Sequence, residues 1–196
     1  MNLPNKLTVA RIALVPVFAA LAELAYRSHM RLPDSAAGAL LYLFAGIVFS
    51  AASLTDLLDG RIARSRHLVT DFGKFADPLA DKILTTAAFI YMLLEGVCAP
   101  AVLILVLFRE FAVSGLRMVA AGAKDGRVLA ANMWGKVKTA VQMVSIIFFY
   151  FGRAIFPTAG WVDVLAAVLS WVCGALTAIS GVKYFLDNRQ FVSEMK

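Results

Sequence analysis

The sequence predicts an all-α membrane protein, and three observations lead to that fold class. Hydrophobic residues make up 61% of the 196 residues and charged residues only 16%, with a mean hydropathy of +0.77, which is wrong for a soluble domain. Several apolar windows reach the roughly 20 residues that a helix needs to cross a bilayer. These windows leave no room for a soluble domain, so we expect residues 1–196 to form a single integral-membrane catalytic domain.

The apolar windows predict six transmembrane helices. Their approximate ranges are 8–26, 37–58, 78–97, 99–119, 132–153 and 161–185. Ahead of the first window, residues 1–7 contain Pro4 and two asparagines, which predicts a short N-terminal interfacial segment. Residues 27–36 are polar and contain Pro33, so we expect an external loop there.

The basic residues predict the orientation in the membrane. They gather at the start of the chain, between spans two and three, between spans four and five, and at the end of the chain. All these segments fall on one side of an even-numbered bundle, so the positive-inside rule places that side and both termini in the cytoplasm. Arg27, Arg31 and Arg153 oppose this weakly. The net charge of +6 then describes a rim that faces anionic headgroups, and without a soluble basic domain nucleic acid is not an expected partner.

The cysteines and histidines carry no sign of a soft-metal site. Cys98 and Cys173 are isolated in apolar sequence, which predicts packing residues rather than a disulfide. His29 and His67 lie in polar stretches with no second histidine or cysteine at metal-binding spacing. We therefore expect both histidines to be solvated.

Four aspartates at helical spacing stand in one short stretch, although carboxylates beside a hydrophobic span are costly. Asp56 and Asp59 are three residues apart, and Asp77 and Asp81 are four apart, so on helices each pair lies on one face. Two such helices facing one another would direct four carboxylates into one space, where divalent cations relieve their repulsion. Hard oxygen ligands predict Mg²⁺ or Mn²⁺ rather than zinc.

The spacing D-x2-D-G-x2-A-R-x8-G-x3-D-x3-D is the signature of the CDP-alcohol phosphotransferases, and the chain resembles that family at all eight fixed positions. The resemblance implies a membrane enzyme that holds two metal ions, bridging the pyrophosphate of a CDP-linked lipid, with Asp56, Asp59 and Asp77 as the first-choice ligands. It supports Asp81 as the general base for an attacking hydroxyl, with metal contact as a second duty. A homodimer is a further family expectation.

The other fixed residues of the signature are expected at the CDP-lipid, together with Asp59. Gly60 and Ala63 lack bulky side chains, so a base or ribose can lie close against the helix backbone. Arg64 would hold a phosphate by charge-assisted hydrogen bonds. Gly73 permits a close approach as the chain turns into the third span.

Asn5, Thr8 and Arg11 follow one another at three-residue spacing and form a polar stripe at the start of the first span. Two interpretations have equal weight. The stripe is either a capped helix start with a snorkelling arginine, or part of the lining of the nucleotide pocket. The second interpretation follows from the resemblance, which implies that the N-terminal helix borders this pocket.

A second polar set, in spans four and five, is expected to bind the acceptor. Arg109 lies well inside a hydrophobic window, where an unpaired charge costs about 3 kcal/mol or more, so it should meet an anion. Its sequence neighbour Glu110 leaves the helix at a different angle and is not an obvious partner. Arg109, Arg117 and Lys136 are expected to surround a phosphate monoester. Lys138 points to the opposite side of its helix from Lys136 and is expected to snorkel.

The segments 2–11, 77–82, 109–111 and 134–139 resemble the branch of the family that makes phosphatidylglycerophosphate. This implies CDP-diacylglycerol and glycerol 3-phosphate as substrates, and a bacterial inner membrane with the active site facing the cytoplasm. One alternative is a relative with another acceptor, namely inositol phosphate, serine or phosphatidylglycerol. A transporter or metal carrier is a more remote alternative, because it leaves Gly60, Ala63 and Arg64 without a role.

Overall fold

The structure, a computed structural model, describes residues 3–65, 71–122 and 133–189, with side chains for residues 8–55, 79–120 and 133–189. Within these ranges the chain is all-helical, and no strand occurs. The helices are α1 (Leu3–Arg31), α2 (Ala36–Ser65), α3 (Asp71–Leu94), α4 (Pro100–Gly122), α5 (Met133–Ile155) and α6 (Gly160–Asp187). The predicted all-α class is therefore confirmed.

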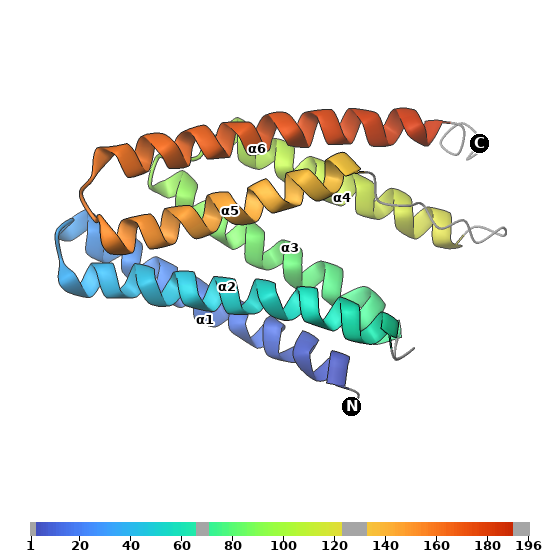
Figure 1. Cartoon of the computed structure of the whole chain (residues 1–196), viewed down its shortest axis with the longest axis horizontal. Coiled ribbons are helices and arrows are strands. Elements are labelled where there is room, and N and C mark those ends of the chain that lie inside the picture. Colours follow the sequence, from blue (N-terminus) through green and yellow to red (C-terminus); the bar gives the residue numbers. More distant parts are fainter. Residues whose placement is uncertain (1–2, 66–70, 123–132, 190–196) are drawn as a thin grey trace.

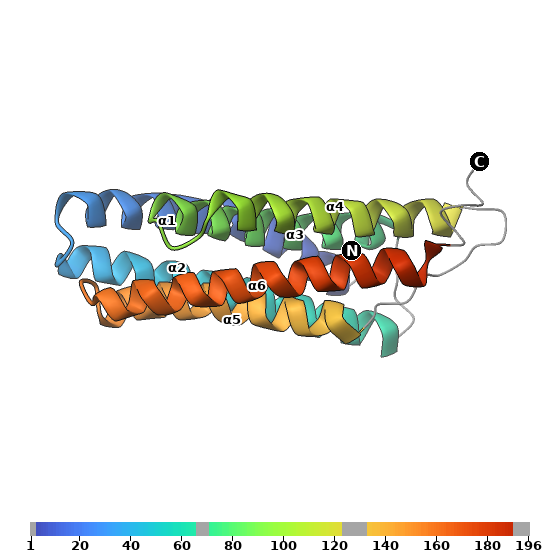
Figure 2. The same cartoon turned by 90° about the horizontal axis from the view of Figure 1, so that it is seen from above.

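The helices form two layers. Figure 2 shows α1, α3 and α4 in one layer and α2, α5 and α6 in the other. Across the layers, α1 packs on α2, α3 on α5 and α4 on α6. Figure 1 shows that α1 begins and α6 ends at the same end of the bundle, where α2 and α4 also end and α3 and α5 begin. We call this the motif end, and we call the opposite end, with the connections 32–35, 95–99 and 156–159, the far end.

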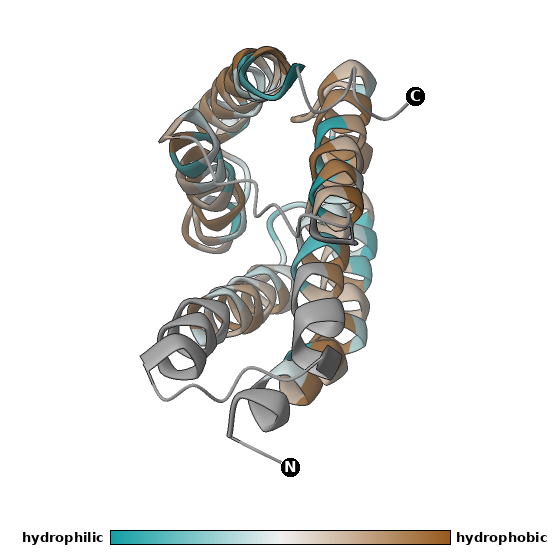
Figure 3. Cartoon of the chain, turned by 90° about the vertical axis from the view of Figure 1, so that its right-hand side faces the viewer, coloured by the Kyte–Doolittle hydropathy of each residue, from teal (hydrophilic) through white to brown (hydrophobic). Residues whose placement is uncertain are grey.

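Three helical segments are long and apolar enough to cross a bilayer in the part of the chain that the structure describes. They are Thr8–Arg31, Ala36–Thr55 and Gly160–Asp187. Many large apolar side chains, such as Phe108 and Trp171, are more than half exposed, and Figure 3 shows hydrophobic residues along the helices of both layers. Such surfaces belong in lipid, so the chain is an integral membrane protein.

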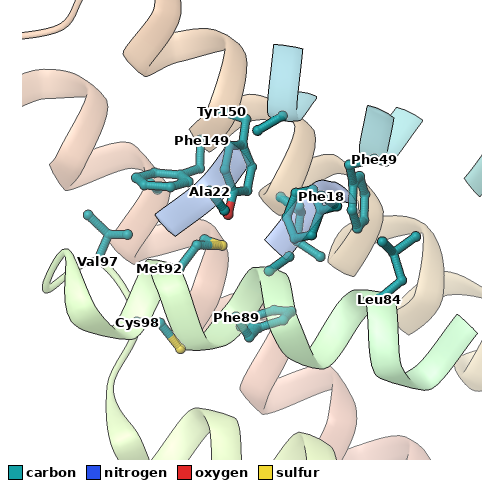
Figure 4. Packing of buried hydrophobic residues seen from close by; sticks show 14 of the residues in the cluster. Phe18, Ala22, Phe49, Leu84, Phe89, Met92, Val97, Cys98, Phe149 and Tyr150 are labelled. Atoms are coloured by element: carbon teal, nitrogen blue, oxygen red, sulfur yellow. The ribbon is translucent and has the colours of Figure 1, made fainter. Parts of the chain in front are cut away.

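Aromatic side chains join the layers in the core (Figure 4). The ring centroid of Phe18 in α1 lies 5.8 Å from that of Phe49 in α2 and 5.3 Å from that of Tyr150 in α5. Tilted and edge-to-face aromatic contacts of this kind stabilise helix pairs. Ala22 and Ala52 are buried beside them, and such small residues let helices approach closely in lipid, where the hydrophobic effect does not drive association.

The helices extend further into polar sequence than predicted. No break separates an interfacial segment from α1, which starts at Leu3 and runs to Arg31. The external loop expected at 27–36 is therefore reduced to residues 32–35, and α3 starts at Asp71 instead of near residue 78. The physical reason is that backbone groups close to a bilayer need hydrogen-bond partners, which a continued helix supplies.

The prediction for His29 was wrong for the same reason. His29 lies in the last turn of α1, its side chain is 15% exposed, and its Nε2 is 3.9 Å from an oxygen of the buried Glu95 carboxylate. His67 lies outside the described residues. Cys98 and Cys173 are buried and free, as predicted.

Candidate functional site

The signature aspartates lie on two consecutive helices at the motif end. Asp56 and Asp59 belong to α2, while Asp77 and Asp81 belong to α3, so the predicted helical spacing is confirmed. The two helices contact one another, and Figure 1 shows the end of α2 and the start of α3 at the same end of the bundle. The side chains of Asp56, Asp59 and Asp77 are outside those described, and the described side chains include no group of three potential metal ligands.

The residues expected at the CDP-lipid follow the same helices. Gly60, Ala63 and Arg64 occupy the last two turns of α2, and their side-chain surroundings are outside the described part. Gly73 was expected where the chain turns into the third span. It is instead the third residue of α3 and therefore lies within a helix. A helical Gly73 can still permit a close approach of a ligand, because it presents no side chain.

Asp81 lies on α3, directly before Lys82. It is half-buried, and the hydroxyl of Thr85 donates a hydrogen bond of 3.0 Å to its backbone carbonyl. The next residue, Lys82, is close enough for its charge to act on the Glu110 carboxylate of α4. The residue after the predicted base is therefore linked electrostatically to the neighbour of Arg109.

The polar stripe on α1 is buried at α2. Thr8 and Arg11 are almost fully buried, and Arg11 Nε donates to the carbonyl of Ala52 at 3.3 Å. The Thr55 hydroxyl donates to the same carbonyl at 2.7 Å. Ala52 lies one helical turn before Asp56 on α2. Of the two interpretations of the stripe, the one with a snorkelling Arg11 is wrong, because the packing of α1 on α2 buries its guanidinium. The side chain of Asn5 lies outside those described.

Arg109, Glu110, Lys138, Gln142 and Ser180 form a buried group between α4, α5 and α6, which we call the inner ion cluster. A Glu110 carboxylate oxygen lies 3.2 Å from Arg109 Nη1 and 2.5 Å from Lys138 Nζ. Lys138 is fully buried and also donates a short hydrogen bond to Gln142. Two predictions were wrong here, since Glu110 is a partner of Arg109, and Lys138 does not snorkel.

Helix α6 supplies the remaining contacts of the two arginines. The Ser180 hydroxyl accepts hydrogen bonds from Arg109 Nε at 3.1 Å and Nη2 at 2.8 Å. Arg117 Nε donates to the Tyr184 hydroxyl at 3.3 Å, and its guanidinium carbon lies 5.4 Å from the Tyr184 ring centroid. Arg109 and Arg117 therefore face the same helix. Lys136 is exposed, and its part in the site stays a prediction.

Among the residues whose side chains the structure describes, the inner ion cluster contains more positive than negative charge. Arg109 and Lys138 share the carboxylate of Glu110, and Arg117 adds a further cation two turns later on α4, where it contacts Tyr184. A buried cation without full compensation is costly, so the cluster favours an anion as ligand.

The sequence contains a signal for the partners on α6 that the sequence analysis missed. Hydroxyl-bearing residues recur along one face of this largely apolar helix, and all of them are buried: Ser170, Thr177, Ser180 and Tyr184.

Comparison with known proteins identifies the family. Residues 1–179 match the family described as CDP-alcohol phosphatidyltransferase. The chain belongs to this family. A CDP-diacylglycerol–glycerol-3-phosphate 3-phosphatidyltransferase of Bacillus subtilis is 42% identical over 189 residues, which cover 95% of each chain. An enzyme of the same name from Rickettsia bellii is 35% identical over 190 residues, which cover 97% of each chain.

Proposed function

We propose that this chain transfers the phosphatidyl group of CDP-diacylglycerol to glycerol 3-phosphate, giving phosphatidylglycerophosphate and CMP. The observation that carries the proposal is the similarity, over nearly the whole chain, to enzymes named for this reaction. The complete aspartate signature on α2 and α3 supports the CDP-lipid half of the reaction. The surplus positive charge of the inner ion cluster supports an acceptor that carries a phosphate.

All six helices span the membrane in this proposal. The shortest, α4 and α5, have 23 residues each. At 1.5 Å per residue this corresponds to about 35 Å, which exceeds the roughly 30 Å hydrocarbon core of a bilayer. The basic residues support a cytoplasmic location for the motif end and both termini, and the bacterial relatives favour an inner membrane. The protein is expected to be a homodimer, as the family resemblance implies.

The donor set fits Mg²⁺ or Mn²⁺, because it consists of carboxylates on two helices that contact one another, and α2 ends and α3 begins at the motif end. Asp56, Asp59, Asp77 and Asp81 would hold two ions. The ions, when bound, neutralise the charge of the pyrophosphate. The cytidine and the phosphates of the lipid would be bound by the residues of the signature and the α1 stripe: Asn5, Thr8, Asp59, Gly60, Ala63, Arg64 and Gly73.

The protein's own residues account for the transfer step. Arg109, Arg117 and Lys136 bind the phosphate of glycerol 3-phosphate and bring its primary hydroxyl to Asp81. Asp81 accepts the hydroxyl proton as the oxygen forms a bond to the lipid-side phosphorus. The bond from this phosphorus to the oxygen of CMP breaks, and CMP leaves in line with the attacking oxygen.

The test is CMP release by the purified protein in detergent with CDP-diacylglycerol as donor. Glycerol 3-phosphate, inositol phosphate, serine and phosphatidylglycerol are offered separately, each with Mg²⁺, with Mn²⁺ and with a chelator. We expect metal-dependent release with glycerol 3-phosphate alone. Release with another acceptor, or release that persists in chelator, would contradict the proposal.

Asp81→Asn tests the general base. Loss of a positioned base lowers turnover roughly 10²- to 10⁴-fold, while CDP-diacylglycerol binding should remain measurable. Asp34→Asn, an exposed position in the 32–35 connection at the far end, is the control and should retain full activity. Retained turnover in Asp81→Asn would exclude this residue as the base.

A further inference from the structure

Ser180 and Gly181, neighbours on α6, hold Arg109 in two ways. The Ser180 hydroxyl accepts from both Nε and Nη2 of the guanidinium, at 3.1 and 2.8 Å. At Gly181, a Cβ atom would come within 3.3 Å of Arg109 Cγ. The glycine therefore makes room for the stem of the arginine, while the serine orients its head.

A third contact comes from Glu110, which is itself held in place. Its carboxylate lies 3.2 Å from Arg109 Nη1 and 2.5 Å from Lys138 Nζ, and Lys138 is bound in turn by Gln142. Because Arg109 and Lys138 are buried and joined in this way, the guanidinium has little freedom to rotate.

The guanidinium nevertheless keeps the capacity to bind a ligand. A guanidinium has five N–H groups, and the bonds to Ser180 and Glu110 use three of them. In the part of the chain with described side chains, one N–H on each terminal nitrogen has no acceptor, and a pair of terminal N–H groups suits two oxygens of a phosphate. A donor pair that is fixed before binding loses little conformational freedom when the ligand arrives.

We infer that Ser180, Gly181 and Glu110 are positioning residues that fix the Arg109 guanidinium for the phosphate of the acceptor. The inference rests on the proposed role of Arg109 in binding that phosphate. Ser180 and Gly181 lie just after residues 1–179, the part of the chain that matches the family, so this assignment comes from the geometry of α6 against α4.

The test compares the KM for glycerol 3-phosphate, the acceptor, with the KM for CDP-diacylglycerol, the donor. Ser180→Ala removes the oxygen that accepts two charge-assisted hydrogen bonds, and we expect the KM for glycerol 3-phosphate to rise roughly tenfold. Gly181→Ala displaces the arginine stem and should raise the same KM. The KM for CDP-diacylglycerol should change less than twofold in both variants.

Two matched controls lie on the same helix. Ser170→Ala removes an equally buried hydroxyl that has no hydrogen-bond partner among the described residues. Gly174→Ala places a Cβ at 3.2 Å from Val102 Cγ2, which is as tight as the contact at Gly181 but does not involve Arg109. Both controls should keep the KM for glycerol 3-phosphate within about twofold of the parent. An equal rise in the controls would assign Ser180 and Gly181 a merely structural role and overturn the inference.

A double-mutant cycle with Arg109→Lys completes the test. If Ser180 acts through Arg109, adding Ser180→Ala to Arg109→Lys should raise the KM no further, whereas independent effects would multiply. Multiplying effects, or an unchanged KM in Ser180→Ala when Arg109→Lys raises it, would overturn the positioning role alone. An unchanged KM for glycerol 3-phosphate in Arg109→Lys would instead overturn the proposed acceptor site, and the positioning role with it.

Discussion

Two buried ion clusters lie at different places in the bundle, and they differ in their balance of charge. In the inner ion cluster, the single carboxylate of Glu110 lies between the cations of Arg109 and Lys138. At the far end the arrangement is reversed. Arg153 Nη2 lies 3.5 Å from Glu95 and 2.9 Å from Asp163, so one cation lies between two carboxylates.

The far-end ion cluster, which consists of Glu95, Arg153, Asp163, Tyr42 and His29, connects separate parts of the chain. Tyr42 of α2 donates a short hydrogen bond to Glu95 in the connection between α3 and α4. Arg153 belongs to α5, Asp163 to α6 and His29 to α1. Asp163 is 38% exposed, so solvent and headgroups screen its charge, while both terminal nitrogens of the arginine have partners within the protein.

This difference indicates different roles. A cluster whose cation is balanced by carboxylates inside the protein holds helices together, since removing one partner leaves a buried charge. A cluster with surplus positive charge leaves binding capacity for an anion from outside. The comparison predicts that loss of Arg153 at the far end lowers stability, whereas loss of Arg109 in the inner ion cluster mainly weakens acceptor binding.

Arg153→Met should have the largest effect on stability. It leaves the buried Glu95 without its cation, a loss of about 3–5 kcal/mol, which lowers Tm by roughly 10 °C in a chain of this length. Thermal unfolding in detergent, followed by circular dichroism, measures the shift. At a temperature where the variant is folded, both KM values should equal those of the parent; a selective rise in the KM for glycerol 3-phosphate would break the comparison.

Arg109→Met should mainly weaken acceptor binding and have a smaller effect on stability. Losing a buried charged contact to a ligand costs about 3 kcal/mol, so the KM for glycerol 3-phosphate should rise roughly 10²-fold. Glu110 keeps Lys138 as its partner, so Tm should fall much less than in Arg153→Met. Steady-state kinetics with each substrate varied in turn measures the two KM values, and the same unfolding assay measures Tm. A fall in Tm as large as that of Arg153→Met would show that both clusters serve stability.

Glu95 in the far-end ion cluster should make stability depend on pH, with a change in Tm of a few degrees at most. Burial raises the pKa of Glu95, while Tyr42 and Arg153 act against the rise. The folded protein then binds the Glu95 proton more tightly than the unfolded chain does. Stability from this group therefore increases as pH falls through the raised pKa and decreases as pH rises through it.

Glu95→Gln removes this dependence and is the reference for the measurement. The Tm of the parent minus that of Glu95→Gln should increase between pH 8 and pH 5. The titrations of His29, Asp163 and more distant groups occur in both proteins, so they largely cancel in the difference. A difference in Tm that is constant with pH would contradict the prediction.

Substitution of Lys136 should have the smallest effect on stability, and substitution of Lys138 on the same helix should have a larger one. Lys136 is exposed, so Lys136→Ala should change the free energy of unfolding by less than about 0.5 kcal/mol, and any effect should fall on the KM for glycerol 3-phosphate. Lys138→Met removes a buried partner of Glu110 and should lower Tm measurably. Equal Tm values for the two variants would mean that the Lys138–Glu110 pair contributes nothing to stability.

Much of the fold could be predicted because helix formation in lipid depends on local composition. The apolar windows located all six helices, and the aspartate spacing placed Asp56, Asp59, Asp77 and Asp81 on two of them. The errors occurred where polar sequence continues a helix, as at Leu3 and Asp71, since hydropathy does not register the backbone's need for hydrogen-bond partners.

The sequence by itself determined the helical class, the family signature and the presence of arginines that need anionic or polar partners. Only the tertiary structure decided which partners they meet. Ser180 is 71 residues from Arg109 in sequence, and their contact depends on how α6 is rotated against α4. The sequence pattern of one helix indicates which residues share a face. How two helices are rotated and shifted against one another results from the packing of all side chains between them.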